Sequence, residues 1–233
     1  MEENKRPVLS GMSRRETIGA LCWIPLHLLL LPIALVMIGP GLDSADLNFL
    51  VYAIGTAALG IFCFRFLARE FGPFCQQIPG ILLQILAFYG YMLLGNLLVK
   101  SLLGLTLPEM NPNNEAVMDL AEQGGVKIVV MTVILAPILE ELMFRAGLFG
   151  LLHRVSRVLA YTVVILAFAA YHVWGYAMEE PLYWLYMLEY VPITFLLCRL
   201  YEKTRTIWSS ILLHMMVNAI SMLLLSMAEG LNL

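Results

Sequence analysis

The chain has 233 residues, of which 61% are hydrophobic and 13% are charged, and its net charge at pH 7 is −3. A soluble domain carries about twice that share of charged residues, so the composition excludes an ordinary soluble protein. The small net charge without a basic block also excludes nucleic acid as an expected partner. We therefore expect an all-α polytopic membrane protein whose surroundings are the lipid bilayer.

Runs of about 20 apolar residues, the length that crosses a bilayer, recur along the chain. They predict a bundle of about seven (six to eight) transmembrane helices with a polar cavity inside the membrane. No small-residue cleavage site follows the first run, so we expect a retained helix rather than a signal peptide. The predicted spans are Ile18–Ile38, Leu47–Leu67, Ile81–Val99, Val126–Phe144, Val158–Tyr176, Tyr183–Leu200 and Ile207–Met227.

These spans suggest three parts of the chain. Residues 1–17 form a cytoplasmic N-terminal tail, and residues 18–125 hold the first helices and an external loop. Residues 126–233 form the core that carries the candidate site. In the external loop, turn-forming Asn111 and Pro112 precede an amphipathic stretch, Glu115–Glu122, which predicts a short external helix that lies on the membrane or caps the bundle. Prolines within the spans, such as Pro32 and Pro137, predict kinks.

Charges alternate in sign between successive loops. By the positive-inside rule this predicts a cytoplasmic N-terminus and an external C-terminus. Only Lys100 and Lys127 break the alternation, each at the border of a span. The basic side holds Lys5, Arg6, Arg14, Arg15, Arg65, Arg69, Arg145, Arg154, Arg157, Arg199, Lys203 and Arg205, and the acidic side holds Asp43, Asp46, Glu109, Glu115, Asp119, Glu122, Glu179 and Glu180.

Two adjacent carboxylates, Glu140 and Glu141, lie inside the fourth span, and Arg145 follows them. One ionised group at the centre of a bilayer helix costs about 2.5–3.5 kcal/mol, so these side chains must face a polar interior. Glu141 and Arg145 are spaced i,i+4 and are expected to pair. Successive helix residues point about 100° apart, so Glu140 faces elsewhere. Either all three form a structural ion-pair network, or Glu140 is left for chemistry.

Two later spans carry histidines at their middle. Phe168 and His172 share one helix face, and so do His214 and Asn218. Each pair by itself is equally consistent with hydrogen bonding between packed helices. In a hairpin that turns near Ser156, however, Glu140 and His172 lie at one level, sixteen residues from the turn on either side.

The predicted depths of Glu140 and His214 in the membrane disagree. At 1.5 Å per residue, His214 lies about 13 Å beyond Arg205, whereas Glu140 lies about 21 Å from Arg154. The two depths agree only if the fourth and fifth helices project beyond the bilayer on the inside.

A carboxylate and an imidazole at one level can hold and deprotonate a water molecule. A second histidine with an asparagine can donate hydrogen bonds to the oxyanion of a tetrahedral intermediate. The same residues, Glu140, His172 and His214, are also a familiar zinc-ligand set. The residues alone do not separate metal-free from metal-dependent chemistry.

Together these motifs resemble those of the CPBP intramembrane proteases, the CAAX-processing and bacteriocin-processing family also called Abi. Glu140-Glu141-Leu142-Met143-Phe144-Arg145 is similar to the family's Glu-Glu-x-x-x-Arg. Phe168 to His172 is similar to its Phe-x-x-x-His, and His214 to Asn218 to its His-x-x-x-Asn. The motifs follow in the family's order, over about residues 126–225.

The resemblance implies an endopeptidase with a water-filled cavity among the motif helices. Glu140 would be the general base, His172 its partner, and His214 with Asn218 the oxyanion hole. Glu141, Arg145 and Phe168 would support the site. The family is commonly labelled metallopeptidase, and a glutamate-activated water without metal is the rival account. We expect the metal-free one here, because the three potential ligands lie on three helices and asparagine is an unusual zinc ligand.

The resemblance leaves the substrate open. Eukaryotic members remove the last three residues of prenylated proteins, and compact bacterial members act in bacteriocin self-immunity, peptide maturation or regulated proteolysis. The expected partners are therefore a peptide or a lipidated protein. By analogy the compact chain is expected in a bacterial plasma membrane. Its oligomeric state stays open.

Two other functions compete with proteolysis. A non-catalytic immunity or scaffold protein would bind a peptide or partner in the same cavity. A proton-coupled transporter would use Glu140, Glu141 and Glu189 as a relay. Glu189, at mid-span, is otherwise expected to line the substrate cavity.

Overall fold

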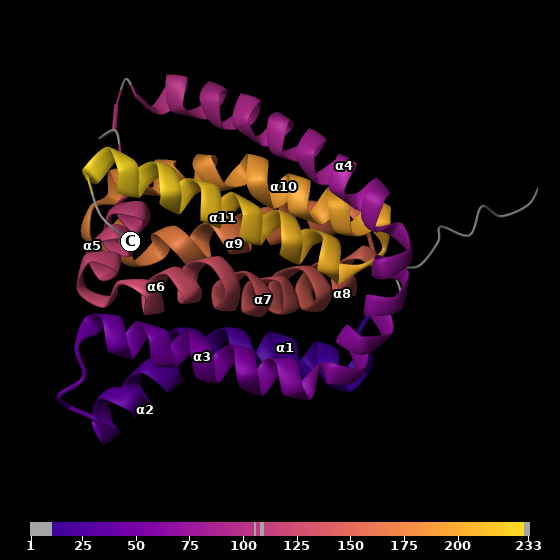
Figure 1. Cartoon of the computed structure of the whole chain (residues 1–233), viewed down its shortest axis with the longest axis horizontal. Helices are drawn as coiled ribbons and strands as arrows, with labels where there is room; N and C mark the ends of the chain where they lie inside the picture. Colours follow the sequence, from indigo (N-terminus) through magenta and orange to yellow (C-terminus); the bar gives the residue numbers. More distant parts are fainter. Residues whose placement is uncertain (1–10, 105, 108–109, 231–233) are drawn as a thin grey trace, which may run out of the picture.

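The computed structural model describes residues 11–104, 106–107 and 110–230, and every regular element in these ranges is a helix. Six helical runs are long and apolar enough to cross a membrane. Figure 1 shows the long helices lying side by side in a bundle. The predicted all-α polytopic fold is therefore confirmed. Residues 1–10 of the predicted tail, with Lys5 and Arg6, lie outside the described residues, and so does Glu109.

The first span is one helical run built from α1 (Arg14–Pro25), the π-helical turn η1 (Leu26–Leu30) and α2 (Leu31–Ile38). A capping box begins it. The Ser13 hydroxyl accepts a hydrogen bond from the Glu16 amide, and the Glu16 carboxylate accepts one from the Ser13 amide. Because these bonds satisfy free backbone donors, the helix begins before the apolar residues do, at Arg14 rather than Ile18.

Two five-residue π-helical turns stand immediately before prolines. η1 is followed by Leu31 and Pro32, and η2 (Met131–Leu135) is followed by Ala136 and Pro137. Proline has no backbone N–H to donate, and its ring clashes with the carbonyl of the preceding turn. A π-turn widens that preceding turn. The prolines therefore produce local bulges here and do not interrupt the helical run.

The second and third predicted spans have different boundaries in the structure. α3 (Ser44–Phe62) ends at Cys63, before the predicted end at Leu67, and α4 (Phe64–Leu103) then continues for 40 residues through the predicted third span. The first part of α4 runs along one end of the bundle, at the right of Figure 1. There the indole N–H of Trp208 donates to the carbonyl of Leu67. The polar residues between the two spans are thus helical.

A short helix, α5 (Pro112–Gly124), lies at the opposite end of the bundle (Figure 1). Asn111 caps it by accepting a hydrogen bond from the Asn113 amide. It ends at Gly125, whose φ of 52° is a left-handed conformation that glycine adopts without strain. The structure confirms the short helix that the sequence predicts here.

The fourth predicted span belongs to a longer run of consecutive elements, α6 (Val126–Val130), η2, α7 (Ala136–Glu140), η3 (Glu141–Phe149) and α8 (Gly150–His153). η3 is π-helical over nine residues. A helix closed by i→i+5 bonds holds more residues per turn than an α-helix, so it advances less along its axis per residue. This shortens the distance between Glu140 and the end of the run, which reduces the predicted disagreement in depth with His214.

The last three spans are α9 (Arg157–Glu179), the 3₁₀ turn η4 (Pro181–Tyr186) with α10 (Met187–Thr204), and α11 (Ile207–Glu229). Near the end of α10, the Glu202 carboxylate joins three helices. It lies 3.0 Å from His153 Nε2 and 2.7 Å from Arg157 Nε. These contacts hold the ends of α8, α9 and α10 at one level and so align the motif helices.

Candidate active site

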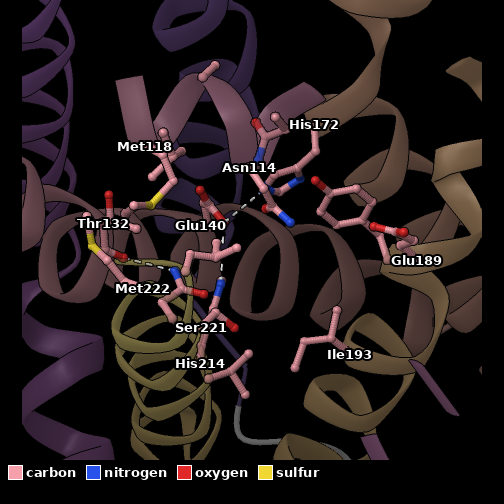
Figure 2. Close-up of a pocket in the computed structure, with 18 of the residues that line it drawn as sticks. Asn114, Met118, Thr132, Glu140, His172, Glu189, Ile193, His214, Ser221 and Met222 are labelled. Atoms are coloured by element: carbon pink, nitrogen blue, oxygen red, sulfur yellow. Dashed lines mark hydrogen bonds and ion pairs between the residues drawn. The ribbon is translucent and has the colours of Figure 1, made fainter. Parts of the chain in front are cut away.

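Glu140 lies between two imidazoles contributed by two other helices (Figure 2). Its Oε2 is 3.8 Å from His172 Nε2 on α9 and 3.8 Å from His214 Nε2 on α11. The Glu140 and His214 residues are both buried. Distances of this length are too long for direct hydrogen bonds and suit a bridging water. The structure therefore brings together three residues that the sequence predicted as one site.

His172 is oriented by its own helix. Its Nδ1 lies 2.8 Å from the carbonyl oxygen of Phe168, one turn earlier in α9. A carbonyl oxygen only accepts hydrogen bonds, so Nδ1 carries the proton and the neutral ring presents the lone pair of Nε2 to Glu140. Tyr190 of α10 stacks on the imidazole with ring centroids 4.6 Å apart. Backbone and stacking contacts thus fix both the position and the tautomer of this ring.

His214 is oriented by Glu141. The imidazole Nδ1 lies 2.9 Å from Glu141 Oε1, and Arg145 Nη1 lies 3.1 Å from the same oxygen. Glu141 and Arg145 have no solvent exposure. The predicted i,i+4 pair is thus present, and Glu140 faces away from it. The sequence did not reveal that Glu141 also holds His214, because that contact crosses between η3 and α11.

Phe168 packs against the guanidinium group of Arg145. The guanidinium carbon of Arg145 lies 4.1 Å from the centroid of the Phe168 ring. A cation over an aromatic face is stabilised by the ring quadrupole, most strongly where water is excluded. The same ring packs against the His172 imidazole at 4.5 Å. One phenylalanine therefore supports both the buried cation and a site histidine.

Asn218 is tied to the π-turn η2. Its Nδ2 donates a hydrogen bond of 2.9 Å to the carbonyl oxygen of Thr132. The bond uses one hydrogen of the amide group and leaves the other, because a primary amide carries two. Asn218 lines the cavity that holds Glu140.

The predicted polar cavity is present and has a volume of about 350 Å³. Its wall comes from α3, α4, α5, η2, α7, α9, α10 and α11, so the cavity reaches from Glu140 to α5. Glu189 lies in this wall, as predicted, and its Oε2 accepts a hydrogen bond of 3.0 Å from Asn111 Nδ2. Glu189 therefore holds the start of α5 against the cavity.

Several wall residues were not among the sequence-predicted site residues. Tyr52 of α3 lines the cavity, and its hydroxyl lies 3.2 Å from that of Tyr171. Asn96 and Lys100 of α4 also line it. The first three spans were placed only by hydropathy, which does not tell which helix face meets the site. The one available signal was Lys100, which breaks the charge alternation.

A structural metal ion is held by several ligand side chains that stand close together. Within the described ranges, no three His, Cys, Asp or Glu side chains form such a group. We therefore derive no step through a metal.

Residues 122–220 match the family model of the Rce1-like proteins, described as type II CAAX prenyl endopeptidase Rce1-like. The matched segment contains all three motifs, from Glu140 to Asn218. Neither a comparison with curated proteins nor one with solved structures found a match. With its six apolar helices, the protein is an integral, multi-pass membrane protein. The match over residues 122–220 confirms that this part of the chain resembles the CAAX-type intramembrane proteases.

Proposed function

We propose that the protein is an endopeptidase that hydrolyses peptide bonds of membrane-associated or prenylated, CAAX-type substrates by means of a water activated by Glu140. The observation that carries this proposal is the placement of Glu140 Oε2 at 3.8 Å from both His172 Nε2 and His214 Nε2. A water molecule in this space is within reach of a general base and a fixed hydrogen-bond acceptor.

In the proposed reaction, the water donates one hydrogen bond to Glu140 and the other to the lone pair of His172 Nε2. Glu140 takes a proton as the water oxygen attacks the carbonyl carbon of the scissile bond. The tetrahedral intermediate then collapses, the C–N bond breaks, and Glu140 returns the proton to the leaving amine. The contact of His172 with the Phe168 carbonyl keeps its acceptor directed at the water.

His214 and Asn218 are the proposed donors to the oxyanion. Because His214 Nδ1 donates to Glu141, Nε2 carries a hydrogen only when the ring is an imidazolium. The negative charge that develops on the oxyanion beside Nε2, together with the Glu141 carboxylate at Nδ1, stabilises that charged form. The amide hydrogen of Asn218 that is not bonded to Thr132 supplies a second donor. Donors placed where charge develops are typically worth about 3–4 kcal/mol each.

The substrate class follows from the family and from the cavity. The cavity reaches from Glu140 to α5, and its wall combines apolar side chains with side-chain amides. Such a wall suits a peptide that carries a lipid or lies in the membrane. The charge alternation predicts that α5 lies outside a bacterial plasma membrane, with a cytoplasmic N-terminus and an external C-terminus.

The test is cleavage of fluorogenic peptides, with and without a farnesylated cysteine, by protein purified in detergent. Glu140→Gln preserves the shape of the side chain and removes the base, so we expect turnover to fall by at least about 100-fold. Glu122→Gln, an identical change on an exposed residue of α5, should leave turnover unchanged. Thermal unfolding of both variants controls for folding.

The outcomes separate the competing functions. Dependence on the farnesyl group would assign the substrate to the prenylated class, and cleavage without it would assign an unmodified peptide. Turnover that survives in Glu140→Gln would refute the proposed mechanism. A folded wild-type protein that binds these peptides without cleaving any of them would support the non-catalytic immunity or scaffold function.

A further inference from the structure

Two lysines, Lys100 and Lys127, break the charge alternation of the chain, and they differ in their ion pairing. Lys127 forms an ion pair with Asp46, which joins the start of α6 to the start of α3. Lys100 has no carboxylate within ion-pair distance among the residues that the structure describes. A lysine near a membrane helix is costly unless its charge meets water or a partner. Lys100 is exposed near the end of α4, so its ammonium group is accessible to a ligand.

Lys100 lines the catalytic cavity, and within the part of the chain that the structure describes no other lysine or arginine contributes to its wall. The two acidic wall residues are Glu140, the proposed base, and Glu189, which is bonded to Asn111. Neither forms an ion pair with Lys100. Among the described residues, Lys100 is thus a cation of the cavity wall that no carboxylate pairs.

Asn96 lies one helical turn before Lys100 on the same face of α4 and also lines the cavity. Its Oδ1 is buried and has no hydrogen-bond partner among the described residues. A buried acceptor without a donor is destabilising, and a ligand that supplies an N–H can recover that loss. Asn96 and Lys100 therefore present an acceptor and a cation side by side.

The packing of α4 brings these two residues near the reacting groups. Gly95 lies against α10, where an added Cβ would stand 2.9 Å from Pro192 Cβ. The same stretch of α10 carries Tyr190, whose ring stacks on His172. Asn96 thus lies beside the segment that positions His172, and Lys100 lies one turn further along α4, toward α5.

We propose that Lys100 binds the C-terminal carboxylate of the substrate and that Asn96 Oδ1 accepts a hydrogen bond from a backbone N–H of the same peptide. One turn separates the two residues by about 6 Å along the helix. In an extended peptide, two residues span about 7 Å, so a terminal carboxylate and an N–H two residues earlier match that spacing. The enzyme would then select free C-terminal tails. This inference rests on the proposed protease function.

The test compares two fluorogenic peptides of identical sequence, one ending in a free carboxylate and one in a carboxamide. We expect the wild-type protein to cleave the acid with a kcat/KM at least about tenfold higher, the equivalent of one lost charge-assisted contact. In Lys100→Met the ratio of acid to amide should fall toward one, mainly through a raised KM for the acid. Lys100→Arg keeps the cation and should retain the preference.

The matched control is Lys203→Met, which removes a lysine at the other end of the bundle and should leave the ratio unchanged. If the wild type cleaves acid and amide equally well, or if Lys100→Met lowers both rates in proportion, the proposal is overturned. A proportional loss of both rates would indicate that Lys100 stabilises the fold at the membrane interface and does not bind the substrate.

A binding measurement separates failure of this proposal from failure of the protease function. Fluorescence polarisation measures binding of the acid and amide peptides to the Glu140→Gln variant. This measurement does not require the variant to cleave the peptides. Tighter binding of the acid that is lost in Glu140→Gln/Lys100→Met supports the carboxylate site even if no peptide is cleaved. Equal binding of both peptides by Glu140→Gln argues against it.

Discussion

The Nδ1 atom of His214 and the Oε1 atom of Glu141 are 2.9 Å apart, in a contact that joins α11 to the π-helical turn η3. Arg145 binds the same carboxylate, and Glu140 faces the other nitrogen of the same imidazole. An unbroken series of charged and polar groups therefore runs from a fully buried arginine to the proposed general base. Each member orients the next one.

The first prediction concerns the buried pair in this series. Glu141→Gln leaves the Arg145 guanidinium without a counter-charge at a site with no solvent exposure. Breaking a buried ion pair from one side costs about 3–5 kcal/mol, and we expect a loss of stability of that order in thermal unfolding. Turnover should fall as well, because His214 loses its orienting carboxylate.

The double variant Glu141→Gln/Arg145→Gln is the control for this effect. It removes both charges, so it should be less destabilised than the sum of the two single variants. Strictly additive losses would show that the two side chains do not interact in the protein.

The second prediction compares two glycines of α3. A Cβ at Gly55 would lie 3.0 Å from the Leu139 side chain, next to Glu140, whereas a Cβ at Gly60 would meet nothing within 4 Å. Leu139 is fully buried and has little room to move. We expect Gly55→Ala to cost about 1–3 kcal/mol by overpacking and to lower kcat.

Gly60→Ala is the matched control, since it adds the same methyl group to the same helix in open space. It should be neutral or stabilise the protein by about 0.5–1 kcal/mol. Thermal unfolding and turnover of the two variants check the comparison, and equal behaviour of both would contradict the close approach of α3 to α7.

The third prediction concerns the attachment of α5 to the cavity. Asn111 caps α5 through the Asn113 amide and also donates to Glu189. Asn111→Ala removes both bonds, and loss of the cap alone costs about 0.5–2 kcal/mol. We expect faster hydrogen exchange across residues 112–124, measured by mass spectrometry.

Asn111→Ser separates the two contacts. A serine still caps the helix, but its side chain is too short to replace the bond to Glu189. The rate of hydrogen exchange across residues 112–124 in Asn111→Ser should therefore lie between the rates in the wild type and in Asn111→Ala. Unchanged exchange in Asn111→Ala would show that these bonds do not hold α5 in place.

The fourth prediction concerns metal dependence. Because Glu140 itself is the proposed base that activates the water, we expect chelators to leave peptide cleavage unchanged. The measurement is turnover of purified protein after treatment with EDTA and with 1,10-phenanthroline. Activity that disappears with the chelator and returns with zinc would replace the proposed mechanism by a metal-dependent one.

Part of the site could be predicted because its signals are local. The spacing of Glu141 and Arg145 places them on one helix face whatever the rest of the protein does, and the pair is present. The equal distance of Glu140 and His172 from the turn near Ser156 likewise predicted that they meet. The depth of His214 relative to Glu140 was harder to predict. The nine π-helical residues of η3 shorten that helix, and hydropathy does not reveal this.

Other parts depend on contacts between distant segments. Asn218 binds the Thr132 carbonyl across 86 residues of sequence, and Glu189 binds Asn111 across 78. The polar stretch between the second and third predicted spans forms the first part of α4, held by Trp208 and by the Thr206 hydroxyl. No local pattern identifies such partners.

The sequence by itself determined the membrane class, the number of helices within one, and the identity of the polar residues in the spans. The physical reason is that lipid admits polar side chains only where function or pairing requires them, so composition and helical period are sufficient. The tertiary structure decided which helix faces meet. It placed Asn96 and Lys100 of α4 in the cavity wall and Glu141 on His214, because helix packing depends on side-chain shapes along whole faces.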